Sequence, residues 1–269
     1  MTDFAWTEGV GGEVVADRKR LEAVAYGPPP DKAPTIVMLH EGLGCLALWR
    51  DFPQTLAAAT GHGVFAYSRA GYGGSDAVNL PRPLDYMSRE ARFSLPALLE
   101  AIGLKRGILL GHSDGASIAA IYAGDRSDAR IEGLILMAPH LFTEAMGLAS
   151  IAEAAHAYET GDLRAKLAKY HAHVDVAFRG WNDAWLDPGF RAWNIEDAVG
   201  RWRAPALLIQ GADDQYGTLK QIRAIEARSL SPVTSLILKD CRHAPQVDQP
   251  EATLDAIVRF CAKVTAETR

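Results

Sequence analysis

The stretch RGILLGHSDGASIAAIYAGD, residues 106–125, decides the fold class. Its first part is a short, continuous apolar run, and its second part carries small and apolar residues three and four positions apart. The first pattern predicts a strand buried on both faces, and the second predicts a helix. Ser113 lies at the junction, between Gly111 and Gly115, where the chain has to turn sharply. The stretch therefore predicts an α/β fold with an exposed serine at the end of a strand.

The same alternation of strand and helix continues on both sides of this stretch. Apolar runs predict further strands at residues 35–40, 63–68, 133–138, 206–211 and 235–240. Helical patterns occupy residues 48–60, 89–103, 115–125, 219–229 and 249–264. Residues 13–27 predict an antiparallel hairpin at the sheet edge. This order predicts a mostly parallel, doubly wound sheet of about eight strands with helices on both faces.

One connection between predicted strands is far longer than a crossover needs. Residues 140–203 are therefore expected to form an inserted helical cap, and residues 1–139 and 204–269 the core. The insertion is rich in tryptophan, and any ring turned toward the sheet edge has to face the region above the serine. The pocket candidates in the insertion are His140, Trp181, Trp185 and Trp193.

Residues able to activate the serine follow later strands. A serine hydroxyl is a poor nucleophile until a base accepts its proton and donors stabilise the resulting oxyanion. Asp213 and Asp214 end one predicted strand, and His243 follows the next. Because parallel strands present their carboxyl ends at one edge of the sheet, these residues are expected to converge near Ser113. Either aspartate can serve a turn instead.

Five motifs in this order resemble the α/β-hydrolase superfamily from about residue 13 to the C-terminus. They are LHEGLG (39–44), YSRAGYGGSD (67–76), GHSDG (111–115), GADD (211–214) and RHAPQVDQPE (242–251). The resemblance implies that Ser113 is the nucleophile, His243 the base and Asp214 the acid that orients it. It also implies an oxyanion hole formed by the backbone N–H groups of Gly42 and Asp114.

Three residues depart from the family pattern. Glu41 stands where the family usually has glycine, which places a carboxylate close to the site and makes Glu41 a further pocket candidate. Ser68 stands where the family commonly has aspartate, so a structural hydrogen-bond network is expected to be rearranged. The side chain of Asp114 is uncommon at its position and is expected to be favoured by the helix N-terminus.

The resemblance implies a serine hydrolase acting, without a cofactor, on a small or medium, largely apolar ester-like substrate. Hydrolysis of a carbon–carbon bond in a ring-cleavage diketone is an alternative on the same layout, and lactone or thioester hydrolysis also stays open. From another class, the chain could be a ligand-binding or sensing protein on this scaffold. Haloalkane dehalogenases and epoxide hydrolases of this fold use an aspartate nucleophile, against which Ser113 argues. No metal site is expected, since His171 and His173 lack further ligands.

Composition excludes several classes of protein. The formal net charge is -5, with no basic block, so no nucleic-acid partner is expected. Three cysteines that lie far apart fit neither a disulfide framework nor a zinc site. No apolar run approaches the length of a membrane span, and residues 1–20 lack the pattern of a signal peptide. We therefore expect a cytoplasmic protein with a small-molecule substrate and no membrane partner, and leave its oligomeric state open.

Overall fold

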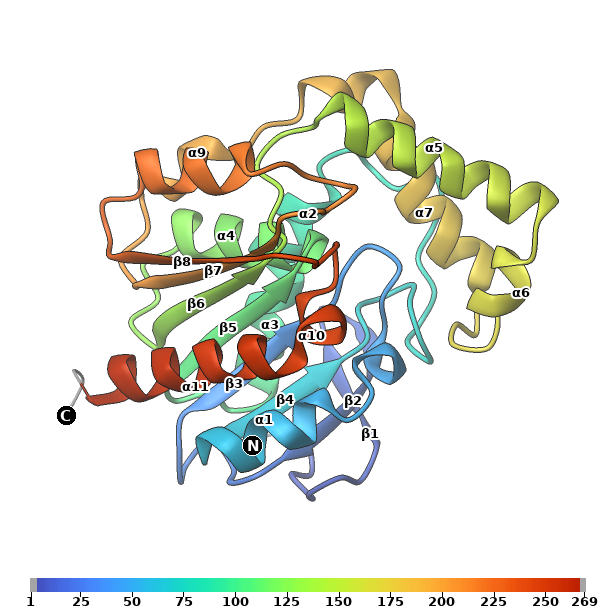
Figure 1. Cartoon of the computed structure of the whole chain (residues 1–269). Coiled ribbons are helices and arrows are strands. Elements are labelled where there is room, and N and C mark those ends of the chain that lie inside the picture. The colour runs from blue at the N-terminus through green and yellow to red at the C-terminus, as the bar shows by residue number, and fades with distance from the viewer. Residues whose placement is uncertain (1–3, 267–269) are drawn as a thin grey trace.

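One sheet with helices on both faces forms the frame of the computed structural model, which describes residues 4–266 (Figure 1). The strands are β1 (Gly12–Ala16), β2 (Lys19–Tyr26), β3 (Thr35–Leu39), β4 (Gly63–Tyr67), β5 (Gly107–His112), β6 (Ile131–Met137), β7 (Ala206–Gly211) and β8 (Val233–Leu238). The α-helices are α1 (Phe52–Thr60), α2 (Tyr86–Arg89), α3 (Leu95–Ala101), α4 (Asp114–Asp125), α5 (Ala145–Thr160), α6 (Leu163–Leu167), α7 (Val174–Leu186), α8 (Glu196–Val199), α9 (Lys220–Arg228), α10 (Pro245–Asp248) and α11 (Pro250–Ala266). Two 3₁₀ helices, η1 (Leu46–Trp49) and η3 (Pro188–Ala192), and the π-helical turn η2 (Glu90–Ser94) complete the elements.

The strand order in the sheet is β1-β2-β4-β3-β5-β6-β7-β8. The strands β1 and β2 form the predicted antiparallel hairpin, and β2 pairs antiparallel with β4. From β4 to β8, all neighbours are parallel. The predicted fold class, a mostly parallel sheet of about eight strands in an α/β fold, is confirmed.

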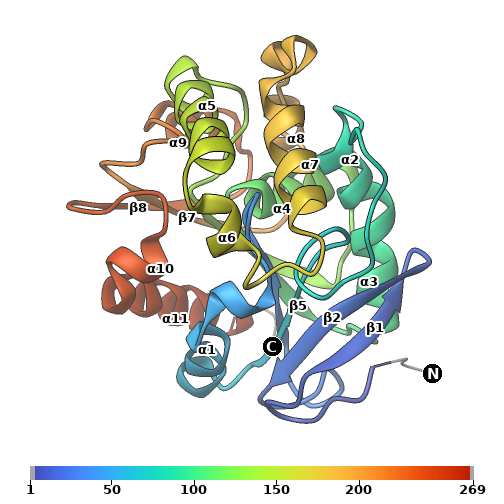
Figure 2. The same ribbon diagram turned by 90° about the vertical axis from the view of Figure 1, so that its right-hand side faces the viewer.

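The central strands are buried on both faces because successive side chains point to opposite sides of a sheet. In β3, Ile36 and Met38 pack with residues of α1 and α11, whereas Val37 and Leu39 pack with residues of α3 and α4. Figure 2 shows α1 and α11 on one side of the sheet and α3 on the other. Continuous apolar runs in the sequence are therefore the runs that fill two separate cores.

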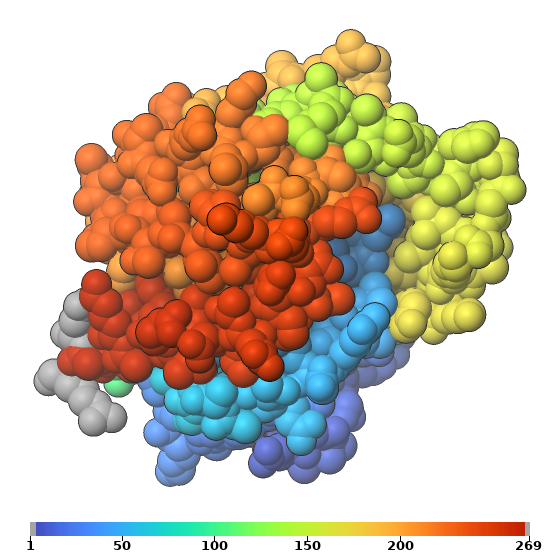
Figure 3. All heavy atoms as spheres, in the orientation of Figure 1, coloured from blue at the N-terminus to red at the C-terminus, as the bar shows by residue number. Residues whose placement is uncertain are grey.

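The helices α5, α6 and α7, between β6 and β7, lie beyond the carboxyl ends of the central strands (Figure 1), whereas α8 packs against α4 and α9. In the space-filling view, α5 and α6, coloured green to yellow, form the upper right of the molecule (Figure 3). The two ends of this insertion meet, since the backbone N–H of Ile195 donates to the carbonyl oxygen of Leu141 at 2.7 Å. Beyond that point the chain returns to the core, where Trp202 Nε1 donates to the carbonyl oxygen of Ala120 in α4 at 2.9 Å.

Within residues 4–266, no helix combines the length and the apolar character needed to cross a membrane.

Candidate active site

Ser113 occupies a strained turn between β5 and α4. Its φ of 54° and ψ of -118° lie in a region that residues with side chains rarely adopt. The turn is tight enough that a Cβ at Gly115 would collide with the backbone of Leu39, and a Cβ at Gly111 with the backbone of Ala116. Both positions therefore require glycine, because the backbone segments approach closely there. The tight turn that they allow places the serine at the carboxyl edge of the sheet.

His243 and Asp214 converge on the same edge. The Nδ1 atom of His243 lies 2.8 Å from Oδ2 and 2.9 Å from Oδ1 of Asp214. Burial opposes the ionisation of Asp214. The hydrogen bond and charge of His243, together with the N–H of Tyr216 and the nearby His140, outweigh burial and lower the pKa of this carboxyl. The backbone N–H of Tyr216 also donates to Asp214, at 2.8 Å. An ionised carboxylate only accepts hydrogen bonds, so the proton of a neutral His243 ring lies on Nδ1 and leaves Nε2 free to act as a base.

Ser113 and His243 line one cavity of about 90 Å³ beneath the insertion. Its walls come from the loop after β3, the turn after β5, the start of the insertion, α5, α7 and the loops after β7 and β8. The lining residues are Glu41, Gly42, Leu43, Ser113, Asp114, His140, Ile151, Trp181, Trp185, Tyr216 and His243. At about 30 Å³ per water molecule, the cavity has room for roughly three waters, so it fits a small ligand.

The loop after β3 is oriented by a buried arginine and a buried histidine. Arg69 donates to the carbonyl oxygens of His40 and Glu41, the latter at 3.1 Å. Burial lowers the pKa of His40 well below its ordinary value, and its Nδ1 lies 2.7 Å from the same Glu41 oxygen. In a trans peptide the N–H points opposite to the C=O. The N–H of Gly42 is therefore directed away from Arg69, and it has no acceptor among the described residues.

A second backbone donor lies at the start of α4. The N–H of Asp114 belongs to the first residue of the helix, where no intrahelical acceptor exists. The Asp114 side chain is buried and accepts from Tyr86 Oη and, at 3.2 Å, from Trp185 Nε1. Burial raises the pKa of this carboxyl despite these donors. The carboxylate expected to interact with the helix N-terminus thus also ties α4 to α2 and to the insertion.

Glu41, which lines the cavity, forms an ion pair with His112. Its Oε2 lies 3.3 Å from Nδ1 of His112, whose Nε2 lies 2.7 Å from the carbonyl oxygen of His243. Burial opposes ionisation of Glu41, but the contact with His112 lowers its pKa to about 2. Burial likewise disfavours the charged His112 ring, yet Glu41 raises the pKa of His112 overall. The pair therefore connects the loop of Gly42 to the loop of His243.

Most of the residues proposed from the sequence are brought together. Ser113, His243, Gly42, Asp114, Glu41, His140, Trp181 and Trp185 line the cavity, and Asp214 lies behind His243. Trp193 is the exception. It is not among the described residues that line the cavity, because it stacks on Phe190 with ring centroids 5.2 Å apart and packs against Trp185. The expectation that Trp193 is a pocket residue is corrected.

Sequence reasoning missed four residues of the site. Tyr216 places its ring 4.7 Å from that of His243, and Leu43 and Ile151 add apolar surface to the cavity. The fourth is His112 of the GHSDG motif, which contacts both Glu41 and His243. Tyr216 follows Asp214 by two positions, and that proximity was the signal available for it.

Two further histidines, His140 and His171, have structural roles near the site. Burial lowers the pKa of His140 to about 3, so its ring is neutral in the cavity wall. His171 accepts from the N–H of Gly73 at 3.0 Å, and its Nε2 lies 3.2 Å from the carbonyl oxygen of Leu43. His171 therefore joins the insertion to the loop of Gly42. Within residues 4–266, no group of three or more His, Cys, Asp or Glu side chains is placed to hold a metal ion.

Ser68 takes part in a hydrogen-bond network that joins the loop after β4 to β2. Ser68 Oγ accepts from the N–H of Leu46 at 2.8 Å and donates to Oε2 of Glu22 at 2.7 Å. The same Glu22 oxygen accepts from the N–H of Gly74 at 3.0 Å. A serine and a glutamate on the neighbouring strand thus supply together a carboxylate that bonds the loop after β4.

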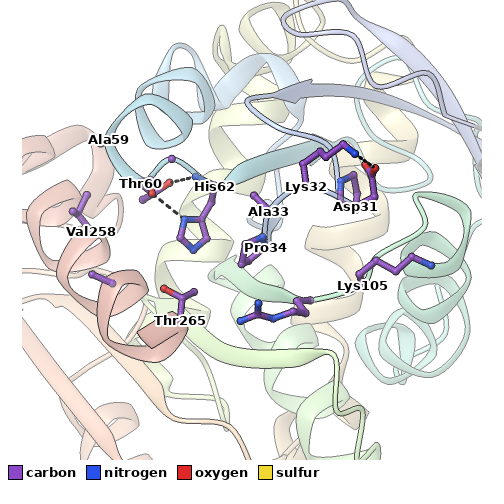
Figure 4. Close-up of a pocket in the computed structure, with 14 residues that line it drawn as sticks. Asp31, Lys32, Ala33, Pro34, Ala59, Thr60, His62, Lys105, Val258 and Thr265 are labelled. Atoms are coloured by element: carbon purple, nitrogen blue, oxygen red, sulfur yellow. Dashed lines mark hydrogen bonds and ion pairs between the residues drawn. The ribbon is translucent and has the colours of Figure 1, made fainter. Parts of the chain in front are cut away.

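Another hollow, of about 600 Å³, lies at the opposite edge of the sheet (Figure 4). Its residues precede β3, β4 and β5 or belong to the end of α11. Lys32 pairs there with Asp31 at 3.1 Å, and His62 Nδ1 lies 3.0 Å from the carbonyl oxygen of Thr60. This hollow is separated from Ser113 by the length of the strands and does not belong to the candidate site.

Comparisons with known proteins show similarity to hydrolases over most of the chain. Over 236 residues the chain is 27% identical to the putative carbamate hydrolase RutD of Pseudomonas savastanoi pv. phaseolicola, which covers 80% of this chain and 89% of that protein. Over 104 residues it is 31% identical to epoxide hydrolase B of Mycobacterium tuberculosis, covering 39% of this chain. That match spans only 28% of the length of epoxide hydrolase B.

The fold is also found in solved structures of low sequence identity. An esterase from Exiguobacterium antarcticum superimposes with a TM-score of 0.75 at 17% identity, over 94% of this chain and 100% of that one. At this identity the likeness concerns the fold alone. The model of the alpha/beta hydrolase family matches residues 36–256, which is most of the chain. The chain therefore belongs to the alpha/beta hydrolase family.

Proposed function

We propose that this protein is a serine hydrolase that cleaves an ester-like bond of a small, largely apolar substrate. The observation that carries the proposal is the placement of Ser113. It lies at a strained turn, in one cavity with His243, whose Nδ1 is held 2.8 Å from Asp214. Strain of this kind persists where the surrounding structure holds it, and it exposes the hydroxyl to a ligand in the cavity.

In the proposed reaction, Ser113 Oγ attacks the acyl carbon and its proton passes to Nε2 of His243. The carbonyl oxygen becomes negatively charged and accepts from the N–H groups of Gly42 and Asp114, neither of which has an acceptor in the described chain. His243 then protonates the leaving alcohol, and an acyl group remains on Ser113. A water molecule, deprotonated by His243, releases the acid and restores the serine.

The cavity favours a small substrate with an apolar side. The apolar wall is formed by Leu43, Ile151, Trp181 and Trp185. The volume of about 90 Å³ equals that of roughly three water molecules. RutD is described as a putative carbamate hydrolase, so a carbamate belongs among the acyl compounds to be tested. We infer short acyl esters, lactones or carbamates as the substrate class.

Epoxide hydrolysis is less well supported despite the relative of that name. Ser113 stands where epoxide hydrolases of this fold use an aspartate. Tyr158 bonds to Asp175 at 2.6 Å and stacks on Phe178, and Tyr170 is exposed, so neither tyrosine of the insertion faces the cavity. Cleavage of a carbon–carbon bond in a diketone and a sensing role are the remaining alternatives, and both are decided by experiment.

Labelling with a fluorophosphonate probe tests the proposal directly. We expect the wild-type protein and Ser94→Ala, a serine outside the cavity, to be labelled and to hydrolyse short p-nitrophenyl esters. Ser113→Ala is expected to keep its fold and lose turnover by several orders of magnitude, roughly 10⁶-fold in a model triad enzyme. A labelled Ser113→Ala protein, or one retaining more than a few per cent of kcat, would refute the role of Ser113. A folded wild type that is neither labelled nor active on esters, carbamates or a vinylogous diketone would favour sensing.

A further inference from the structure

The indole edge of Trp181 lies directly against Gly42. A Cβ added at Gly42 would collide with Nε1 and Cδ1 of Trp181 and lie 3.0 Å from Cε2. Trp181 belongs to α7 of the insertion, and Gly42 belongs to the loop after β3. A residue larger than glycine at position 42 would thus displace this tryptophan. The insertion and the loop meet at the backbone donor assigned to the oxyanion.

The two cavity tryptophans use their N–H groups differently. Trp185 donates to Tyr86 Oη at 3.0 Å and to Asp114 at 3.2 Å, so its N–H is satisfied within the protein. Trp181 Nε1 has no hydrogen-bond acceptor among the described residues. The atom is also not fully buried, so it can be reached from the cavity. Since Trp181 lines the cavity, its free N–H is available to a ligand.

The distance between the two donors suits a shared acceptor. Because Nε1 is closer than Cε2 to the Cβ position of Gly42, it lies within 3.0 Å of that position. Standard bond lengths and angles then put the Gly42 nitrogen within about 5.5 Å of Trp181 Nε1. Two N–H donors that bond to one oxygen at about 2.9 Å each are at most about 6 Å apart. The separation of the two nitrogens is therefore within the range that a shared oxygen acceptor requires.

We propose that Trp181 is a catalytic residue that donates a third hydrogen bond to the carbonyl oxygen as it becomes negatively charged. This inference rests on the serine mechanism proposed above. Gly42 and Asp114 supply backbone donors from the core, and Trp181 supplies a side-chain donor from the insertion. The oxyanion hole is complete only when α7 lies over the core.

This arrangement places a requirement on the substrate. The oxygen has to approach the edge of an indole ring that packs on Phe178, with ring centroids 6.2 Å apart, and that is only 7% exposed. A donor in such a water-poor place stabilises negative charge more strongly than it would in water. Binding of the uncharged substrate gains less, so the contribution of Trp181 is expected in kcat rather than in KM.

Trp181→Phe tests the proposal because it removes the N–H and keeps an aromatic ring. A hydrogen bond to a charged group contributes about 1.5–3 kcal/mol, so kcat on a short p-nitrophenyl ester should fall roughly 10- to 100-fold. KM should change little. Affinity for a trifluoromethyl ketone, which forms a tetrahedral adduct with the serine, should fall in parallel with kcat. Trp193→Phe, in the same insertion but outside the cavity, is the matched control and should keep the wild-type kcat.

The outcomes separate this inference from the proposed function. If wild type is labelled by the fluorophosphonate and Trp181→Phe keeps both kcat and inhibitor affinity, Trp181 only packs the insertion and the inference is overturned. If the wild type is not labelled, the serine mechanism itself fails. Should Trp181→Phe not fold, the indole ¹⁵N–¹H signal of Trp181 in the wild type decides. Formation of the phosphonate adduct should move that proton downfield, and an unchanged signal would refute the donor role.

Discussion

Replacing Glu41 by glutamine removes one charge from a buried ion pair while keeping the shape of the side chain. Glu41 Oε2 lies 3.3 Å from Nδ1 of His112, and the His112 side chain is only 3% exposed. A neutral amide cannot compensate a charged His112 ring that is kept from water, so folding then favours the neutral ring. We expect Glu41→Gln to be less stable than the wild type in a manner that depends on pH.

The size of the effect follows from the lowered pKa of Glu41. A fall from 4.5 to about 2 corresponds to a stabilisation of about 3 kcal/mol by the charged form. Glu41 keeps 27% of its side chain exposed, so about 3 kcal/mol is an upper bound.

The pH range of the effect follows from the direction of both shifts. The pKa of Glu41 is depressed, so its stabilisation is present above pH 4.5 and is lost as the pH falls toward 2. The pKa of His112 is raised above 6.5, so its share is fully present below pH 6.5 and is lost as the pH rises through the raised value. The difference in unfolding free energy between wild type and Glu41→Gln should therefore be largest between about pH 4.5 and 6.5.

Urea denaturation at a series of pH values measures this difference. Glu13→Gln is the control, because Glu13 forms an exposed ion pair with Arg20 and loses the same formal charge. An exposed pair contributes about 0–1 kcal/mol, so the control should show a small, flat difference. A flat profile for Glu41→Gln, or a loss that grows steadily above pH 8, would contradict the charged pair.

Two further substitutions test the assignment of individual residues. Asp214→Asn should lower kcat roughly 10⁴-fold, since the amide no longer holds His243 in the required tautomer, whereas Asp213→Asn, at an exposed loop position, should have little effect. Equal losses in ester hydrolysis by the two variants would overturn the choice of Asp214. Trp193→Ala should lower Tm, because the ring stacks on Phe190, and leave the preference among p-nitrophenyl esters of different chain length unchanged. A changed chain-length preference would show that Trp193 contacts the substrate.

The sheet and the turn that carries Ser113 could be predicted from local sequence patterns. Every predicted strand is present, with ends that differ by no more than two residues, because burial on both faces leaves a continuous apolar run in each central strand. The spacing of Gly111 and Gly115 around Ser113 predicted the sharp turn for an equally local reason. A Cβ at either glycine has no room in that turn.

The order of the motifs along the chain also predicted which loops would meet. In a parallel sheet, all loops that follow strands emerge at one edge, so the position of a residue after its strand is enough to place it near Ser113. This reasoning brought His243 and the aspartate pair to the correct edge. It could not choose between Asp213 and Asp214, because the choice depends on which side chain turns inward at the end of β7.

The way in which the insertion packs against the core could not be predicted from the sequence. The sequence offers no reason to rank Trp181, Trp185 and Trp193 as pocket residues. In the structure, the first contacts Gly42, the second donates a hydrogen bond to Asp114, and the third stacks on Phe190 outside the cavity. The pair of Glu41 and His112 was likewise hidden, since its members lie on different loops. The spacing of aromatic residues indicates which rings share a helix face. Which part of the protein that face contacts depends on segments far apart in the chain. Those contacts form only when the whole chain has folded.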